Sequence, residues 1–181
     1  MEKATQRIKK VAIIGPESTG KSDLCELLAQ HYRTVFVPEY ARQYFERHDI
    51  SKYELSDLVL IAKEQLALEK SMLSKAQGFL FYDTTLITIK IWAQHRFKTV
   101  PKIISESIKA DDYDYYLLSN NDVEWVKDPQ RFDEDIRDYL FELNKQELEV
   151  LGVRYDIIKG VGEERLHSTI KLIDDFFGFS K

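Results

Sequence analysis

The chain has 181 residues, which is enough for one domain with a substantial hydrophobic core that needs no disulfide or metal staple. Its 44% hydrophobic and 31% charged residues are typical of a globular protein, and its net charge of −5 disfavours nucleic acid or an anionic membrane as a partner. The single cysteine makes no internal disulfide and no apolar run reaches the length of a membrane span, so we expect one cytoplasmic domain over residues 1–181.

Short apolar runs alternate with helical segments, which predicts an α/β fold with a five-stranded parallel sheet flanked by helices. The predicted strands are residues 10–14, 34–37, 79–82, 114–118 and 154–158, and the predicted helices are residues 23–30, 39–48, 51–76, 84–97, 101–110, 129–151 and 163–177. The stripe of the longest helix comprises Leu55, Leu58, Val59, Ala62, Leu66 and Leu73. Because ligands bind at the carboxyl ends of parallel strands, we expect the chemistry just past each strand.

The segment after the first strand, residues 15–22, matches the pattern G-x-x-x-x-G-K-[ST] between a strand and a helix. In this context backbone N–H groups wrap a polyphosphate, Lys21 reaches its β- and γ-phosphates, and the Ser22 hydroxyl holds Mg²⁺. Glycine is expected at 15 and 20 because a Cβ would block the turn or the approach of backbone to phosphate. The alternative is an ordinary turn with chance glycines. The predicted ATP-binding residues are Gly15, Glu17, Ser18, Thr19, Gly20, Lys21, Ser22 and Asp23.

A carboxylate and a guanidinium follow the second strand. Glu39 and Arg42 are three residues apart and therefore share a helix face. At this edge of the sheet the carboxylate would take a proton from an attacking hydroxyl or order metal-bound water, and the arginine would hold an anion or a sugar hydroxyl. A surface ion pair at a helix start explains the same spacing equally well.

The third strand ends in Asp83, which is the position of a carboxylate that organises Mg²⁺ beside Ser22. The alternative is that Asp83 caps the following helix. Thr84 or Thr85 would serve as the cap instead, which favours the metal role for Asp83.

The segment after the fourth strand leads into a charged helix that we expect to act as a lid over the transferred phosphoryl group. Arg131 is its first candidate and Arg137 its second; the alternatives are surface pairs with Asp135 and Asp133. Trp125 either stacks on a ligand ring or covers core. A guanine-reading Asn-Lys-x-Asp segment is missing from this position, which favours ATP over GTP.

After the fifth strand, residues 160–165 form a predicted loop that would border the adenine. Ordinary turn formation explains its two glycines equally well.

Four segments in order form the pattern of a known family: the loop at residues 15–22, Glu39-Tyr40-x-Arg42, Phe81-Tyr82-Asp83-Thr84, and Asn120-Asn121 followed by Glu124-Trp125-Val126-x-Asp128-x-x-Arg131. With these segments the chain resembles the NadR-type ribosylnicotinamide kinase domain, a P-loop small-molecule kinase among the AAA-like ATP-binding domains.

The resemblance implies a P-loop kinase fold with a helical lid, acting in NAD biosynthesis. It implies transfer of the ATP γ-phosphate to the 5′-hydroxyl of nicotinamide riboside, with Mg²⁺ as cofactor. The implied catalytic residues are Lys21, Glu39, Asp83 and Arg131, with Ser22 and Asp83 at the metal and Tyr40, Arg42, Trp125 and Asp128 at the substrate.

Two departures from the family pattern bear on the acceptor. The aromatic residues that sandwich the nicotinamide ring in relatives are replaced by Pro38 and by the segment at residues 68–70, so Tyr40, Tyr44 or Trp92 would have to substitute. The fused adenylyltransferase motif is missing, so this chain alone should not make the dinucleotide. The alternative to a kinase is an ATP-binding regulatory switch with slow ATPase activity and no small-molecule acceptor.

Overall fold

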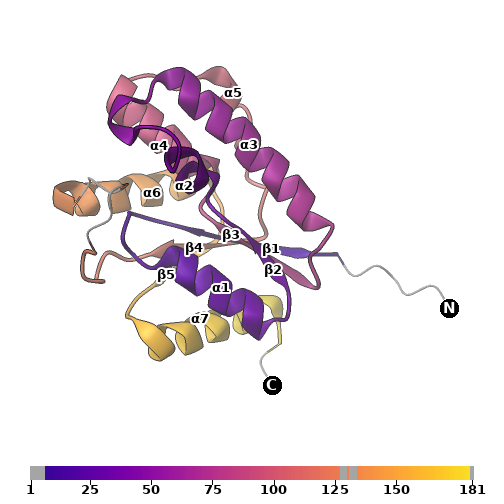
Figure 1. Ribbon diagram of the computed structural model, residues 1–181. Coiled ribbons are helices and arrows are strands. Elements are labelled where there is room, and N and C mark those ends of the chain that lie inside the picture. The colour runs from indigo at the N-terminus through magenta and orange to yellow at the C-terminus, as the bar shows by residue number, and fades with distance from the viewer. Residues whose placement is uncertain (1–6, 127–129, 131–133, 180–181) are drawn as a thin grey trace.

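A computed structural model describes residues 7–126, 130 and 134–179, in which five parallel strands form one sheet of order β2-β3-β1-β4-β5 (Figure 1). The strands are β1 (Lys9–Ile14), β2 (Val35–Val37), β3 (Phe79–Asp83), β4 (Tyr115–Ser119) and β5 (Tyr155–Ile158). The helices are α1 (Lys21–His31), α2 (Tyr40–Phe45), α3 (Leu55–Leu73), α4 (Leu86–Phe97), α5 (Lys102–Ser105), α6 (Arg137–Leu151) and α7 (Gly162–Phe177). Short 3-10 turns, η1 (Ile50–Lys52) and η2 (Glu134–Ile136), complete the order. The predicted α/β fold with a five-stranded parallel sheet is confirmed.

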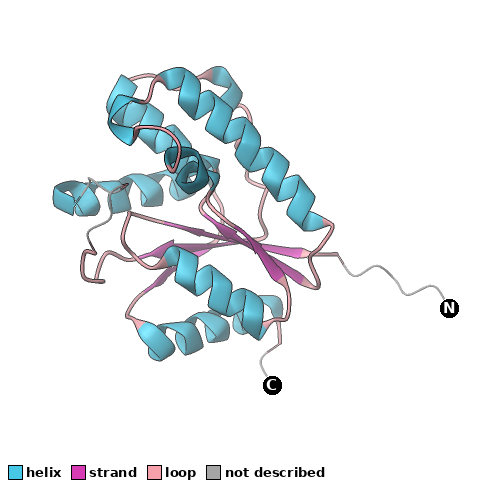
Figure 2. Ribbon diagram, viewed as in Figure 1, coloured by secondary structure: helices cyan, strands magenta, loops and turns pink. Residues whose placement is uncertain are grey.

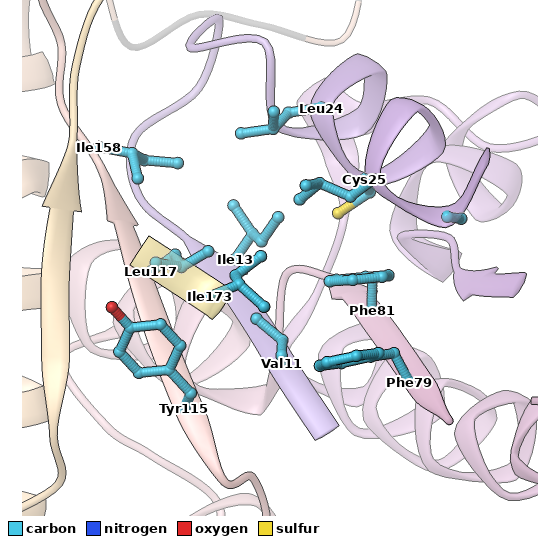
Figure 3. Close-up of a cluster of buried hydrophobic side chains, with 12 residues drawn as sticks. Val11, Ile13, Leu24, Cys25, Phe79, Phe81, Tyr115, Leu117, Ile158 and Ile173 are labelled. Carbon is cyan, nitrogen blue, oxygen red and sulfur yellow. The ribbon is translucent and has the colours of Figure 1, made fainter. Parts of the chain in front are cut away.

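Alternating side chains of β1 pack into two separate hydrophobic clusters, one on each face of the sheet. Val11 and Ile13 pack with α1 and α7, around Cys25 and Phe81 (Figure 3). Ala12 and Ile14 pack on the opposite face, against α4 and α6. These four residues of β1 are fully buried, as expected for the central strand of a parallel sheet that is covered on both sides (Figure 2).

A third cluster joins α2, α3, α4 and α5 on one side of the sheet and carries no strand. The stripe predicted for α3 is wrong at its C-terminal part, because Leu66 and Leu73 are exposed. The helix instead buries Gln65, whose side chain reaches the chain just before α2. Among the described residues, no helix is long and apolar enough to cross a membrane.

Several predicted helices are shorter in the structure. The prediction for residues 101–110 is right only over α5, because Ser107 Oγ donates to the Ile103 carbonyl and Asp112 then accepts from the Lys109 N–H, which turns the chain. The segment predicted over residues 39–48 gives only α2. The one predicted over residues 129–151 gives η2 and α6, and its residues 129 and 131–133 lie outside the described part of the chain.

A carboxyl group sits among tyrosines on the α3 side of the sheet. Glu69 of α3 accepts a hydrogen bond from the Tyr113 hydroxyl at 3.1 Å to each oxygen, close to Tyr82 and Tyr116. Burial raises the pKa of Glu69 to about 7, and the negative charge of Asp112 adds to the shift, although the Tyr113 hydrogen bond opposes it. The folded protein therefore favours the protonated form of this side chain.

The Glu69→Gln variant should remove a pH-dependent part of the stability. A carboxyl whose pKa rises on folding stabilises the fold fully below its unfolded pKa, and this contribution is lost as the pH rises through its folded pKa of about 7. We therefore expect the free energy of unfolding of the wild type, relative to Glu69→Gln, to fall by about 2–3 kcal/mol between pH 4.5 and 8. Urea unfolding at several pH values measures this difference.

The matched control is Glu64→Gln, an exposed position on the same helix. Parallel stability curves for wild type and Glu69→Gln over this pH range would contradict the assignment.

Candidate active site

The loop at residues 15–22 joins the end of β1 to the start of α1, as the motif predicts. Gly15 has a φ of +140° and lies so close to β4 that a Cβ would stand 2.7 Å from the Ser119 carbonyl oxygen. Glycine is therefore required here by contact with the neighbouring strand, and not only by the approach of a phosphate. Gly20, in the left-handed region with a φ of +67°, is the N-cap of α1.

The side chains of the loop are ordered by the loop's own backbone. Lys21 Nζ donates to the Pro16 carbonyl at 2.6 Å, and Thr19 Oγ1 donates to the same oxygen at 2.9 Å. The ammonium group thus lies across the loop, where phosphate oxygens would compete for it. All predicted ATP-binding residues line one pocket: Gly15, Glu17, Ser18, Thr19, Gly20, Lys21, Ser22 and Asp23.

The lining of this pocket extends well past the phosphate loop. Apolar and aromatic side chains of α2, α4 and α6 form its far wall, and the polar side chains there are hydroxyls and amides. That wall consists of Ala41, Phe45, Ile50, Thr88, Ile91, Trp92, Leu140 and Asn144. A loop that only held a polyphosphate would need no such extension, so the pocket has room for a second molecule.

Glu39 and Arg42 line the same pocket as the phosphate loop. Arg42 Nε is 3.7 Å from Glu39 Oε2, so the ion pair that the alternative interpretation predicts is present. The Glu39 side chain is only 15% exposed, however, so this is not a fully exposed surface pair. Gln65 accepts from the Tyr40 N–H at 2.8 Å and donates to the Pro38 carbonyl at 3.4 Å. The backbone on both sides of Glu39 is therefore fixed from α3. Tyr40, predicted to bind substrate, is not among the lining residues described for the pocket.

Asp83 is the last residue of β3, pairs in register with Ile13 of β1, and is 2% exposed. The cap of α4 is Thr85, whose Oγ1 accepts from the Ile87 N–H at 3.2 Å. Asp83 is thus not needed as a cap, as the threonine alternative predicted. Thr84, between them, has a φ of +73°, a strained conformation for a non-glycine residue next to the pocket.

The pKa of the buried Cys25 thiol depends on charged side chains near the phosphate loop. Burial raises the pKa of Cys25 well above its usual range, and the negative charge of Asp83 raises it further, whereas Lys21 and Arg165 lower it. Asp83 is thus near Cys25 of α1, and α1 packs against β3. A buried carboxylate at a strand end and a hydroxyl in the first turn of α1 are oxygen ligands of the kind that suit Mg²⁺ shared with phosphates.

Among the described residues, no group of three or more His, Cys, Asp or Glu side chains forms a metal site of its own. This agrees with the donor set at the loop, because Mg²⁺ is usually held by one or two protein ligands, water and substrate phosphates.

The segment after β4 lies against the phosphate loop. The Val126 N–H donates to Ser18 Oγ at 2.8 Å, and Arg137 Nη2 donates to the carbonyls of Ser18 at 3.3 Å and Val123 at 2.9 Å. The Arg137 guanidinium also stands 5.6 Å from the centre of the Trp125 ring. The second lid candidate is therefore at the loop.

Arg131, the first lid candidate, and Asp128, predicted to bind substrate, lie outside the described part of the chain, as does the pairing proposed between Arg137 and Asp133. Gln130 is described, lines the pocket and donates to the Arg42 carbonyl at 3.3 Å. Trp125 is not among the described lining residues and packs beside Arg137.

Sequence reasoning missed Arg165, which holds the loop from below. It is 5% exposed, and its guanidinium donates to the Thr19 carbonyl at 2.5 Å and to Ser119 Oγ at 2.8 Å. Burial lowers the pKa of Arg165, although the negative charge of Asp122 opposes this shift. The residues predicted as a loop belong partly to α7, whose buried face is Arg165, Thr169 and Ile173. This spacing of four was the signal that could have placed Arg165 inside.

The chain matches, over residues 10–165, the protein family described as an AAA domain. Two curated relatives, the trifunctional NAD biosynthesis/regulator proteins NadR of Salmonella typhimurium and Escherichia coli, are each 28% identical to it over 127 residues. The match covers 68% of this chain and 31% of each relative, so the chain spans about a third of their length.

Two solved structures share the fold. A NadR protein in complex with NR has a TM-score of 0.83 at 24% identity and covers 94% of this chain and 52% of that one. Deoxyadenosine kinase from M. mycoides has a TM-score of 0.62 at 13% identity, and the match covers 92% of this chain and 99% of that one. The comparisons confirm the P-loop kinase fold and the predicted resemblance to the NadR-type kinase domain.

Replacing Arg165 by methionine should weaken nucleotide binding although the side chain lies behind the loop. The variant leaves the Thr19 carbonyl and Ser119 hydroxyl without their donor and removes a positive charge near the phosphates. We expect the Kd for Mg·ATP to rise about tenfold and the free energy of unfolding to fall by about 2–3 kcal/mol. Isothermal titration calorimetry and urea unfolding measure the two effects.

Arg154→Met, at an exposed arginine beside Phe176, is the control and should leave Mg·ATP affinity unchanged. An unaltered Kd in Arg165→Met would show that the loop keeps its shape without this contact.

Proposed function

The chain belongs to the AAA-domain family, and from this premise we propose that it is a Mg·ATP-dependent kinase whose acceptor is a small nucleoside, with nicotinamide riboside favoured and its mononucleotide as product. The observation that carries the proposal is that one pocket is lined by the phosphate loop, by Glu39 and Arg42, and by the aromatic side chains of Phe45 and Trp92. A NadR protein solved with NR shares the fold, which supports the choice of acceptor.

The loop binds the nucleotide through its backbone N–H groups and the N-terminus of α1, while Lys21 neutralises the β- and γ-phosphates. Bound Mg²⁺ would neutralise further charge on these phosphates, held through Ser22 and Asp83. Most of the catalysis then comes from positioning and electrostatics, since little covalent chemistry falls to the protein in phosphoryl transfer.

The two carboxylates take different roles in this proposal. Glu39 lines the pocket together with the phosphate loop, so it is accessible to an acceptor hydroxyl that attacks the γ-phosphate. Asp83 is nearly inaccessible at the end of β3 and is not among the described lining residues. We therefore assign Glu39 as the base that accepts the hydroxyl proton, with Arg42 holding it ionised and oriented, and Asp83 as the organiser of the metal.

An arginine is needed to stabilise charge on the moving phosphoryl group. Arg137 reaches the loop at Ser18 and is the described candidate for this task. Arg131, placed on the lid by the sequence pattern, remains a candidate for the same task, and Asp128 remains a candidate contact to the substrate.

Aromatic surfaces for the acceptor ring are supplied by α2 and α4. Tyr44 is engaged elsewhere, because its hydroxyl donates to Asp57 at 2.7 Å and its ring stacks on His48 at 3.9 Å. Of the three aromatic residues considered from sequence, only Trp92 is among the described lining residues, and Phe45 joins it there. A positively charged pyridinium ring would gain cation–π attraction from Trp92.

The activity is tested by measuring ATP consumption and phosphorylated product with a panel of nucleosides. A kinase should turn over ATP much faster when the acceptor is present, and Lys21→Ala should lower kcat by about 10²–10³-fold because the phosphate charge loses its main partner. ATP hydrolysis that ignores every nucleoside but responds to a protein partner would instead establish a regulatory switch.

The acceptor ring is tested with Trp92→Ala. Loss of the aromatic face should raise the KM for nicotinamide riboside about 5- to 30-fold, with the KM for ATP unchanged. Trp92→Phe is the matched control and should keep most of the affinity because it keeps a π face. Equal acceptor KM values for wild type and Trp92→Ala would exclude stacking on this side chain.

A further inference from the structure

One polar side chain in the far wall of the pocket has an unmet hydrogen-bonding group. Asn144 of α6 is 3% exposed and lines the pocket with Thr88, Ile91 and Leu140. Its Nδ2 donates to the Leu140 carbonyl at 2.8 Å, one turn earlier in the same helix. Within the described part of the chain, its Oδ1 is buried and has no hydrogen-bond partner.

The direction of this oxygen is fixed by the helix. A flipped amide would set Oδ1 against the Leu140 carbonyl, two acceptors in contact, so the observed orientation is the one that the fold permits. A buried acceptor without a partner is costly, and such groups in folded proteins are nearly always satisfied by a donor from water or a ligand. Asn144 lines the pocket, so an N–H donor on a molecule bound there would satisfy this acceptor once it displaces the atoms that cover Oδ1.

The position of Asn144 indicates which part of an acceptor would reach it. The helix α6 begins at Arg137, which contacts the phosphate loop at Ser18, and Asn144 stands about two turns, or ~10 Å, further along. Thr84 lies two residues before the facing helix α4 and Trp92 lies in the second half of that helix, and both line the pocket. A nucleoside with its 5′-hydroxyl at Glu39 would thus point its base towards Trp92 and Asn144.

We propose that Asn144 Oδ1 accepts a hydrogen bond from an uncharged N–H donor on the base of the acceptor, and that this residue selects a carboxamide-bearing nucleoside over its carboxylate counterpart. The inference rests on the proposed kinase function. A carboxylate in the same place would set a negative charge against the amide oxygen in an apolar wall formed by Ile91 and Leu140, with no donor to offset its desolvation. A ketone analogue would fit the space and leave Oδ1 unsatisfied.

The experiment compares kcat/KM for three ribosides that share one ring: nicotinamide riboside, nicotinic acid riboside and 3-acetylpyridine riboside, in which a methyl group replaces the amide nitrogen. Wild type should prefer the amide at least about tenfold over each analogue. In Asn144→Leu this preference should fall about tenfold or more, while the Kd for Mg·AMP-PNP changes less than twofold. Gln146→Leu, at an exposed position on the same helix, is the control and should behave as wild type.

The outcomes separate the inference from the function beneath it. Phosphorylation of all three ribosides at similar rates by wild type would overturn the role of Asn144 and leave the kinase standing, and this comparison needs no variant to fold. An unchanged amide preference in folded Asn144→Leu would also overturn the role of Asn144. Its Oδ1 would then accept a hydrogen bond from a buried water and not from the acceptor. Wild type that neither phosphorylates nor binds any riboside by calorimetry would overturn both proposals.

Discussion

The close approach of Gly15 to Ser119 is the contact on which the site depends. A side chain at residue 15 would enter the space of the Ser119 carbonyl, so the phosphate loop can leave β1 only along the end of β4. The hydroxyl of the same serine accepts from Arg165, which in turn holds the Thr19 carbonyl from below. Three segments that are distant in sequence therefore set the curvature of one loop.

This support has an electrostatic effect as well as a mechanical one. The loop is approached by Arg165 from the core and by Arg137 from the side, while Lys21 lies across it. Positive charges held by packing need no reorganisation when an anion arrives, so they stabilise it more than mobile surface charges would. Two acidic side chains from other strand ends accompany these charges: Glu39 lines the pocket after β2, and Asp83 is the last residue of β3.

Local patterns in the sequence predicted the parts of the structure that depend on neighbouring residues. The loop at residues 15–22, the threonine cap before α4 and the strand that ends at Asp83 all follow from short-range rules. The failures arise where tertiary contacts decide. Leu66 was assigned to the buried stripe of α3, but Gln65 is buried instead because it binds the backbone around Glu39.

The missed site residues share one property, since their partners are remote in the chain. Arg165 bonds Thr19 across 146 residues, and no local rule pairs the first turn of a last helix with a loop at the other end of the sequence. Asn144 resembles any polar residue of a charged helix until α4 and α6 are seen to enclose the same pocket. Trp92 was one of three aromatic candidates, and only its place in the pocket lining separated it from Tyr40 and Tyr44.

The helix α6 touches the phosphate loop through Arg137 and walls the far pocket through Asn144. A helix of four turns moves as a stiff rod, so a tilt imposed at one end is transmitted to the other. A nucleotide that fixes the position of Arg137 would also fix the position of Asn144 in the acceptor wall. The free energy by which the nucleotide strengthens acceptor binding would equal the free energy by which the acceptor strengthens nucleotide binding. The two substrates of such an enzyme should bind synergistically, each tightening the grip on the other.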